Sequence, residues 1–241
     1  VFYMRTVFRA ADVAMPSIDE LRRGFMPIAQ RFHMDWRLQA LTVRMRVLIA
    51  VSRRGHCLYD LLHRWRSGAL AMDVVGVVSN HDDLRSFVEW NGLPYYHWPV
   101  TPATKAAQEA RLLELIARER VDLLVLARYM QILSPLACAA LAGRCINIHH
   151  AFLPGFKGAK PYHQAYSRGV KIIGATAHYV TTDLDEGPII EQDVARVSHA
   201  HTPAALEQIG RDIECVVLAR AVAWHIEHRV LIAGHKTIVF N

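Results

Sequence analysis

Apolar runs alternate with helical patterns from residue 46 to residue 149, and this alternation restricts the fold more than any other feature. The apolar runs occupy residues 47–51, 74–78, 95–100, 123–126 and 145–149. Helical patterns separate them, at residues 57–65, 84–90 and 105–118 and after Ser134-Pro135. Strands that alternate with helices form parallel sheets, so we expect an α/β fold with a Rossmann-like, mostly parallel sheet.

The rest of the chain frames this core. Residues 172–180 and 188–194 predict two further strands, residues 202–228 a long helix, and residues 231–240 a hairpin around Gly234. We expect residues 42–241 to form one catalytic domain.

Residues 1–41 predict a separate β-α-β unit. Residues 2–9 alternate apolar and polar side chains as a strand does, and residues 34–41 predict a second strand. Between them, Ser17 and Glu20 mark the start of a helix that reaches about Phe32. A unit this small cannot bury its own faces, so we expect it to be truncated at its N-terminus.

Composition excludes several classes of function. The chain has 28 basic and 22 acidic residues, a net charge of +6, but no basic cluster interleaved with aromatic residues, so we expect no nucleic-acid partner. No apolar run reaches about 18 residues, and we expect no membrane partner. The first residues lack a signal-peptide pattern, and the 4 cysteines show no C-x-x-C spacing. We therefore expect a cytoplasmic protein with reduced thiols.

Residues 147–187 hold more groups of catalytic type than a structural role needs. Asn147 and His149 are two positions apart on an expected strand, so they share a face. Asp185 lies in a turn at residues 184–187 between two expected strands. An Asn amide can stabilise an oxyanion, a His can carry a proton to a leaving nitrogen, and a carboxylate can orient the His or a water. Together these groups suit attack on a carbonyl at a carbon–nitrogen bond.

Other assignments stay open for residues of this stretch. His149, His178 and Asp185 have donor atoms for a metal site, but no H-x-H or H-E-x-x-H spacing supports one, and we expect no metal. His150 points to the opposite face from His149, which favours a structural role. His163 fits a structural or a functional role equally. No G-x-S-x-G motif is present, so we expect no acyl-enzyme.

The motifs of this stretch are long and specific: N-I-H at residues 147–149, Leu153-Pro154, and T-D-L-D-E-G at residues 182–187. They resemble the formyltransferase family that uses 10-formyltetrahydrofolate, which includes glycinamide ribonucleotide transformylase and methionyl-tRNA formyltransferase. More narrowly, residues 127–135 and 152–166 are similar to the formyltetrahydrofolate deformylases, the hydrolytic branch. The resemblance covers essentially the whole chain, and residues 1–41 resemble the second half of an ACT domain, a ferredoxin-like α+β unit.

The resemblance implies a role for each matching residue. Asn147 would polarise the formyl oxygen, His149 would be the general acid/base, and Asp185 the essential carboxylate. His178 would be a pocket histidine beside that carboxylate. The walls of the pteridine pocket would be Met130, Gln131, Ile132, Leu133, Thr182, Asp183 and Leu184.

The implied activity is hydrolysis of 10-formyltetrahydrofolate to tetrahydrofolate and formate, without a cofactor. It would supply formate and balance the one-carbon folate pool for purine biosynthesis. A transferase would grip a phosphorylated acceptor with a glycine-rich loop at a helix N-terminus, whereas residues 52–57 hold one glycine, Gly55, beside Arg53 and Arg54. Two alternatives stay open: formyl transfer to an amine such as glycinamide ribonucleotide, and a non-catalytic regulator that binds folate or amino acids.

The chain departs from the deformylase pattern in two places. Ala151 stands where deformylases commonly carry Ser after the double His. The N-terminal unit lacks the first half of an ACT domain, the part of the family associated with amino-acid effectors. Because ACT units usually pair, we expect a homo-oligomer.

Overall fold

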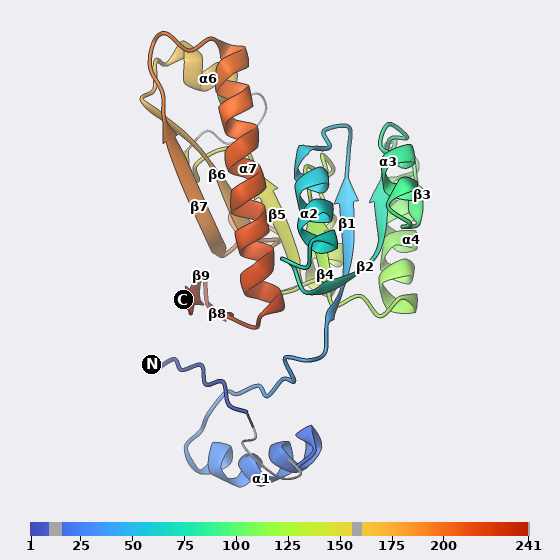
Figure 1. The fold of residues 1–241 in the computed structure, drawn as a ribbon, viewed down its shortest axis with the longest axis vertical. Helices are drawn as coiled ribbons and strands as arrows, with labels where there is room; N and C mark the ends of the chain where they lie inside the picture. Colours follow the sequence, from blue (N-terminus) through green and yellow to red (C-terminus); the bar gives the residue numbers. More distant parts are fainter. Residues whose placement is uncertain (10–15, 156–160, 241) are drawn as a thin grey trace.

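The computed structural model describes residues 1–9, 16–155 and 161–240, and a single mixed sheet forms its centre (Figure 1). Its strands are β1 (Met45–Val51), β2 (Met72–Ser79), β3 (Tyr95–His97), β4 (Leu123–Leu126), β5 (Cys145–His149), β6 (Ile172–Tyr179) and β7 (Ile189–Arg196). Their order is β3-β2-β1-β4-β5-β6-β7. The first five are parallel, and β6 is antiparallel to both of its neighbours, β5 and β7. The expected mostly parallel sheet is confirmed.

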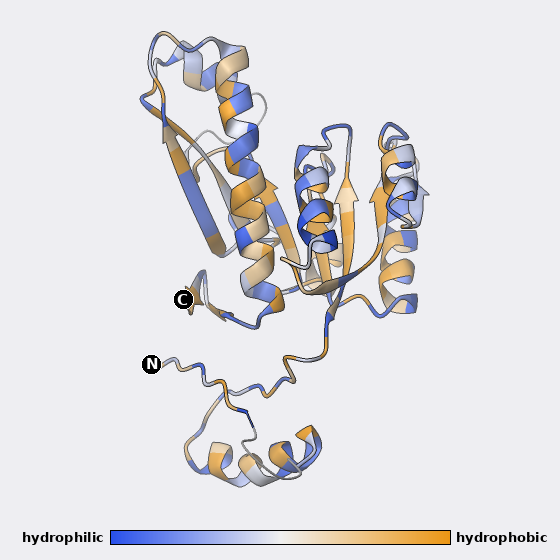
Figure 2. Cartoon of the chain, in the orientation of Figure 1, coloured by the Kyte–Doolittle hydropathy of each residue, from blue (hydrophilic) through white to orange (hydrophobic). Residues whose placement is uncertain are grey.

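Helices cover both faces of the sheet. The helices are α2 (His56–Arg66), α3 (Arg85–Trp90), α4 (Lys105–Arg118), α5 (Pro135–Ala140), α6 (Pro161–Ser167) and α7 (Pro203–Ile226). One apolar layer joins α2 and α7 to the sheet, and a second joins α4 and α5 to the other face. Because strands buried on both faces need apolar side chains throughout, β4 and residues 47–51 of β1 are continuous apolar runs (Figure 2).

The strand order reverses at β1, which lies between β2 and β4. The loops that follow β1 and β4 therefore leave the sheet in different directions, and ligands of open α/β sheets bind at such a point. Ser52, directly after β1, ties the two loops together. Its Oγ donates to Asn80 Oδ1 at 2.7 Å and accepts from the backbone N–H of Met130 at 3.0 Å.

Of the β-α-β unit expected in residues 1–41, only the helix is confirmed. Helix α1 (Ile18–Arg31) begins with a complete capping box between Ser17 and Glu20. The strands expected at residues 2–9 and 34–41 are wrong, because neither segment pairs with another strand in the described residues. Apolar alternation yields a strand only where a neighbouring edge accepts its backbone hydrogen bonds, and here Phe2 and Phe8 are exposed. The division at residue 41 and the ACT resemblance stay predictions.

The remaining differences are local. The strand expected at residues 95–100 ends at His97, and α6 is a short helix that the sequence did not predict. The expected C-terminal hairpin is confirmed as β8 (Val230–Ala233) and β9 (Lys236–Val239). Part of the deformylase-like motif, residues 156–160, lies outside the described residues. Among the residues that are described, no helix has the length and apolarity to cross a membrane.

Protonation of His225 should make the protein less stable in mild acid. Its Nδ1 lies 2.7 Å from the Tyr179 hydroxyl oxygen, and burial, with the nearby His228, lowers its pKa from 6.5 to about 4. The unfolded chain therefore binds one more proton between those pH values, so this contribution is complete above pH 6.5 and is lost as pH falls toward 4. We expect the free energy of unfolding to fall by about 3 kcal/mol across this range, measured by urea unfolding. His225→Gln should flatten that slope, whereas His235→Gln, at an exposed position, should leave it unchanged.

Candidate active site

Strands β5 and β6 bring the expected catalytic residues to one face of the sheet. In the register of the pair, Asn147 lies opposite His178 and His149 opposite Thr176. The neighbours Cys145 and Leu126 pack in the layer under α4 and α5. Because side chains alternate along a strand, Asn147 and His149 face the α4/α5 side and His150 faces the α2/α7 side, as predicted.

The turn between β6 and β7 folds back so that Asp185 meets both histidines. Its Oδ2 lies 3.3 Å from His149 Nδ1, and its Oδ1 lies 3.7 Å from His178 Nε2. Asp185 adopts a left-handed backbone conformation, with φ of 57°, which non-glycine residues rarely do. The predicted approach of Asp185 to His149 is confirmed.

Hydrogen bonding keeps Asp185 ionised. Burial by itself raises the pKa of this carboxyl, but the hydrogen bond from His149 and the nearby ring of His178 outweigh burial and hold the pKa well below its usual range. Asp185 is therefore a carboxylate at neutral pH and fixes His149 through Nδ1. The other ring nitrogen, Nε2, is buried and has no hydrogen-bond partner among the described residues. It is the atom left to exchange a proton with a substrate.

His178 orients the amide of Asn147. Its Nδ1 lies 2.9 Å from the carbonyl oxygen of Tyr179, which can only accept, so Nδ1 carries a proton. In the neutral ring Nε2 must then accept, and Asn147 Nδ2 lies 3.2 Å from it. Asn147 thus donates one N–H to His178 and keeps its second N–H for another acceptor. An amide held this way suits an oxyanion.

The expected pteridine walls follow β4 and β6. Met130 and Ile132 are exposed, Leu133 is buried and Gln131 lies between these extremes. The other wall, residues 182–184, is exposed throughout. Exposed apolar side chains are consistent with a binding wall, and the assignment of these seven residues stays a prediction.

Two polar residues that the sequence did not single out hold the loop after β5. Thr176 Oγ1 donates to the Ala151 carbonyl at 2.9 Å and accepts from the Leu153 N–H at 3.1 Å. Gln192 Nε2 donates to Thr176 Oγ1 at 2.9 Å and to the Leu153 carbonyl at 3.0 Å. Ala151 enters this network through its backbone, so the position keeps its conformation without a hydroxyl.

A second polar cluster lies on the α2/α7 side of the sheet, and it was not predicted from the sequence. At its centre is Glu214 of α7, whose Oε2 lies 2.7 Å from His56 Nε2 and whose Oε1 accepts from the Tyr162 hydroxyl at 2.7 Å. Arg128 Nε lies 3.5 Å from the same carboxylate. The sequence feature that could have indicated this cluster is Glu214 itself, a charged residue on an otherwise apolar helix face, one turn before Val217 and Leu218.

The loop after β1 is packed rather than open. A Cβ on Gly55 would lie 2.7 Å from the Tyr59 ring and 2.9 Å from Leu84. On either side of this glycine, His56 bonds to Glu214, and Arg54 forms an ion pair with Glu207 of α7. These contacts join the start of α2 to α7, where a transferase would need an open phosphate cradle.

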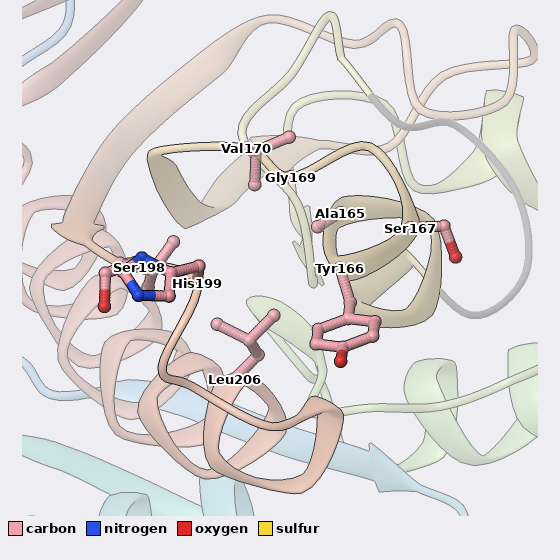
Figure 3. Close-up of a pocket in the computed structure, with 9 residues that line it drawn as sticks. Ala165, Tyr166, Ser167, Gly169, Val170, Ser198, His199 and Leu206 are labelled. Carbon is pink, nitrogen blue, oxygen red and sulfur yellow. The ribbon is translucent and has the colours of Figure 1, made fainter.

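A separate pocket of about 310 Å³ lies between α6 and the start of α7 (Figure 3). Its lining residues are Ala165, Tyr166, Ser167, Gly169, Val170, Val197, Ser198, His199 and Leu206. Figure 3 shows Ser198 and His199 across the pocket from Tyr166. None of the catalytic candidates lines it, so it is not the place of the reaction.

Comparison with known proteins agrees with this arrangement. Residues 45–222 match the model of the formyl transferase family. A formyltetrahydrofolate deformylase of Corynebacterium sp. (strain P-1) is 53% identical over 99% of this chain and 83% of its own. This chain belongs to the formyltetrahydrofolate deformylase family. The sheet, the polar face of β5 and the turn at Asp185 are therefore features of a member of that family.

Solved structures place this member relative to the transferases. The deformylase of Burkholderia mallei ATCC 23344 is 57% identical, with a TM-score of 0.91 over 97% of this chain and 82% of its own. Glycinamide ribonucleotide transformylase 1 of Symbiobacterium toebii is 28% identical, with a TM-score of 0.75 over 86% of this chain and 99% of its own. Both branches thus share the fold, and the reaction depends on local differences at the site.

Gly187 is required by the turn that carries Asp185. A Cβ at this position would lie 1.7 Å from the backbone oxygen of Tyr179, which cannot move away without disrupting β6. We expect Gly187→Ala to lower the free energy of unfolding by about 3 kcal/mol, measured by urea unfolding, and to displace Asp185. Gly24→Ala is the matched control. In the described structure no atom outside its own helix lies within 4 Å of that Cβ, so stability should not fall.

Proposed function

We propose that this protein hydrolyses 10-formyltetrahydrofolate to tetrahydrofolate and formate. One observation carries the proposal. The His149 ring bonds to Asp185 through Nδ1, while its Nε2 is buried and has no hydrogen-bond partner among the described residues. The ring lies on the face of the sheet that carries Asn147. This arrangement can move a proton and stabilise an oxyanion at one carbon. The relatives named as deformylases support the same reaction.

The geometry suggests an order of events. Water attacks the formyl carbon while His149 Nε2 accepts its proton, and the second N–H of Asn147 stabilises the negative charge on the formyl oxygen. His149 then delivers that proton to N10 as the carbon–nitrogen bond breaks. The products are tetrahydrofolate and formate. Asp185 stays ionised throughout and stabilises the imidazolium that forms between the two steps.

Hydrolysis is favoured over formyl transfer by the packed loop after β1. Glycinamide ribonucleotide carries a phosphate, which needs free backbone N–H groups and space. In this chain Arg54 and His56 extend from that loop to α7. We expect formate to appear one-for-one with tetrahydrofolate, and glycinamide ribonucleotide neither to accept formyl groups nor to inhibit.

Product analysis tests the proposal against both alternatives. Purified protein is incubated with 10-formyltetrahydrofolate, with and without glycinamide ribonucleotide, and formate and formylated amine are quantified. Formate alone supports hydrolysis. Formyl transfer faster than formate release would make the protein a transferase, and neither product would indicate a non-catalytic regulator.

The reaction proposed needs no metal and no cofactor. Within the described residues, His56, Cys57 and Glu214 are the one group of three close metal-type donors, with ligand atoms within 4.8 Å of one another. The guanidinium of Arg128 beside the same carboxylate disfavours a cation there. We expect turnover to be unchanged after prolonged treatment with a chelator, measured as formate release with metal content checked by mass spectrometry. Loss of activity restored by zinc would contradict this.

Assembly and location are further parts of the proposal. The N-terminal unit exposes several apolar side chains, among them Phe2, Met4, Phe32, Met34 and Leu41. Apolar surface of this kind supports pairing of this unit in a homo-oligomer, with an amino-acid effector where the ACT domain is complete. The 4 cysteines are free in the described structure, which is consistent with a cytoplasmic protein.

A further inference from the structure

The second polar cluster, formed by His56, Arg128, Tyr162 and Glu214, joins four separate parts of the fold. Glu214 is 1% exposed and lies in the middle of α7. Its partners come from the start of α2, the loop after β4 and helix α6. Burial raises the pKa of Glu214, but the bond from His56 and the charge of Arg128 outweigh it, so the pKa is lowered. The cluster is thus centred on a buried carboxylate.

This cluster lies at the level of His149, on the other side of the sheet. The register pairs Leu126 with Asn147 at the ends of β4 and β5, and Arg128 and His149 each follow this pair by two residues. Between the two polar groups lies His150, whose ring centroid is 5.3 Å from that of His149 and 6.2 Å from that of Tyr162. The cluster is therefore separated from the reacting centre by one imidazole.

The backbone of Arg128 is bent to direct its side chain into this cluster. Along β4, Leu124 and Leu126 face α4 and α5, so continued alternation would place residue 128 on that side too. Instead Arg128 has φ of 63°, and its side chain, 10% exposed, reaches Glu214. Such a conformation costs roughly 1 kcal/mol or more in a non-glycine residue. Nε and Nη1 also lack hydrogen-bond partners among the described residues.

An ion pair maintained at this cost needs an explanation other than stability. Buried ion pairs contribute little to stability compared with apolar packing of the same volume. Nor does the cluster belong to the reacting group, because Asn147, His149 and Asp185 face the α4/α5 side with the predicted pteridine walls. The cluster instead includes His56, at the start of α2, where the loop after β1 would hold the phosphate of an acceptor in a transferase.

We propose that the His56–Glu214–Arg128–Tyr162 cluster is a specificity-determining plug, which fills the nucleophile side of the site and admits water but excludes primary amines. The plug rests on the proposed function and explains why that function is hydrolysis. His56 and Arg128 extend from two loops to one buried carboxylate, so the space between these loops and α7 is occupied. A primary amine is larger than water, so it would have to displace the hydrogen-bonded pair of His56 and Glu214 to enter, whereas water would not.

Opening the plug should allow a second reaction at the same centre. The nitrogen of a primary amine forms a bond to the formyl carbon, the bond from that carbon to N10 breaks, and His149 carries the amine proton to N10. The products are a formylated amine and tetrahydrofolate. Asn147, His149 and Asp185 serve both reactions, so a change in the plug should alter the ratio of products.

The test measures that ratio with glycinamide as the amine probe. Wild-type protein, His56→Ala and the double variant Arg128→Gly/Glu214→Ala are incubated with 10-formyltetrahydrofolate and glycinamide. Formylglycinamide and formate are then quantified by mass spectrometry. The double variant removes both charges together, because a single buried charge left unpaired is strongly destabilising, and Gly tolerates the backbone of position 128. Arg220→Ala/Asp193→Ala, which removes an exposed ion pair between α7 and β7, is the matched control.

We expect the ratio of formylglycinamide to formate to rise about tenfold or more in both plug variants and to stay at the wild-type value in the control. Loss of stability alone would lower both products together and leave the ratio unchanged. A wild-type ratio in folded, active plug variants would overturn the proposal. If the double variant does not fold, His56→Ala decides the question by the same ratio. A wild-type protein that released no formate would instead contradict the proposed hydrolysis.

Discussion

Replacing Asp185 by Asn should lower the turnover of 10-formyltetrahydrofolate by about two or more orders of magnitude while folate binding is retained. The carboxylate lies 3.3 Å from His149 Nδ1, and the hydrogen bond from His149 helps to keep it ionised. A neutral amide of the same size would no longer stabilise the imidazolium that forms as His149 takes the proton from water. Steady-state formate release and folate titration by fluorescence would separate the two effects.

The control for this substitution is Asp193→Asn. Asp193 is a carboxylate on β7 that pairs with Arg220 on the exposed side of α7. The turnover of Asp193→Asn should stay close to that of the wild type, because an exposed ion pair contributes only about 0–1 kcal/mol to stability. Turnover near the wild-type value in Asp185→Asn would exclude Asp185 from the reaction.

Replacing His149 by Gln should reduce turnover by about 10²–10⁴, the range that a positioned general acid/base contributes. Gln can fill the space and form a hydrogen bond, but it cannot carry a proton from water to N10. The measurement is steady-state formate release by the purified variant.

His163→Gln is the matched control, because His163 is exposed on α6, and this exposure favours a role outside catalysis. We expect less than about a twofold change in its turnover, as for most surface substitutions. If His163→Gln lost as much activity as His149→Gln, the assignment of the general acid/base would have to be changed.

The β5 face could be predicted from the sequence because it depends on short-range periodicity. Asn147 and His149 are two positions apart, so one strand places both on one face, and His150 must point to the other. The structure agrees, with His149 beside Asp185 and His150 beside Tyr162. Their mutual placement requires only that residues 145–149 form a strand.

The N-terminal segments show where the same reasoning fails. Residues 2–9 alternate as well as many strands do, yet they form none in the described structure. Alternation describes how side chains would be divided between two faces, but the backbone groups of a strand also need a partner. The helix between them forms as predicted, because its hydrogen bonds and its cap are local.

The sequence by itself thus determined the alternation of strands and helices, the buried strands of the sheet, and the side chains on the catalytic face of β5. Each of these follows from local periodicity and from the need to bury apolar surface. Only the tertiary structure decided that Asp185 turns back onto His149 and that Arg128 reaches Glu214. Both depend on left-handed backbone conformations, which no side-chain pattern specifies and which packing between distant parts of the chain must hold in place.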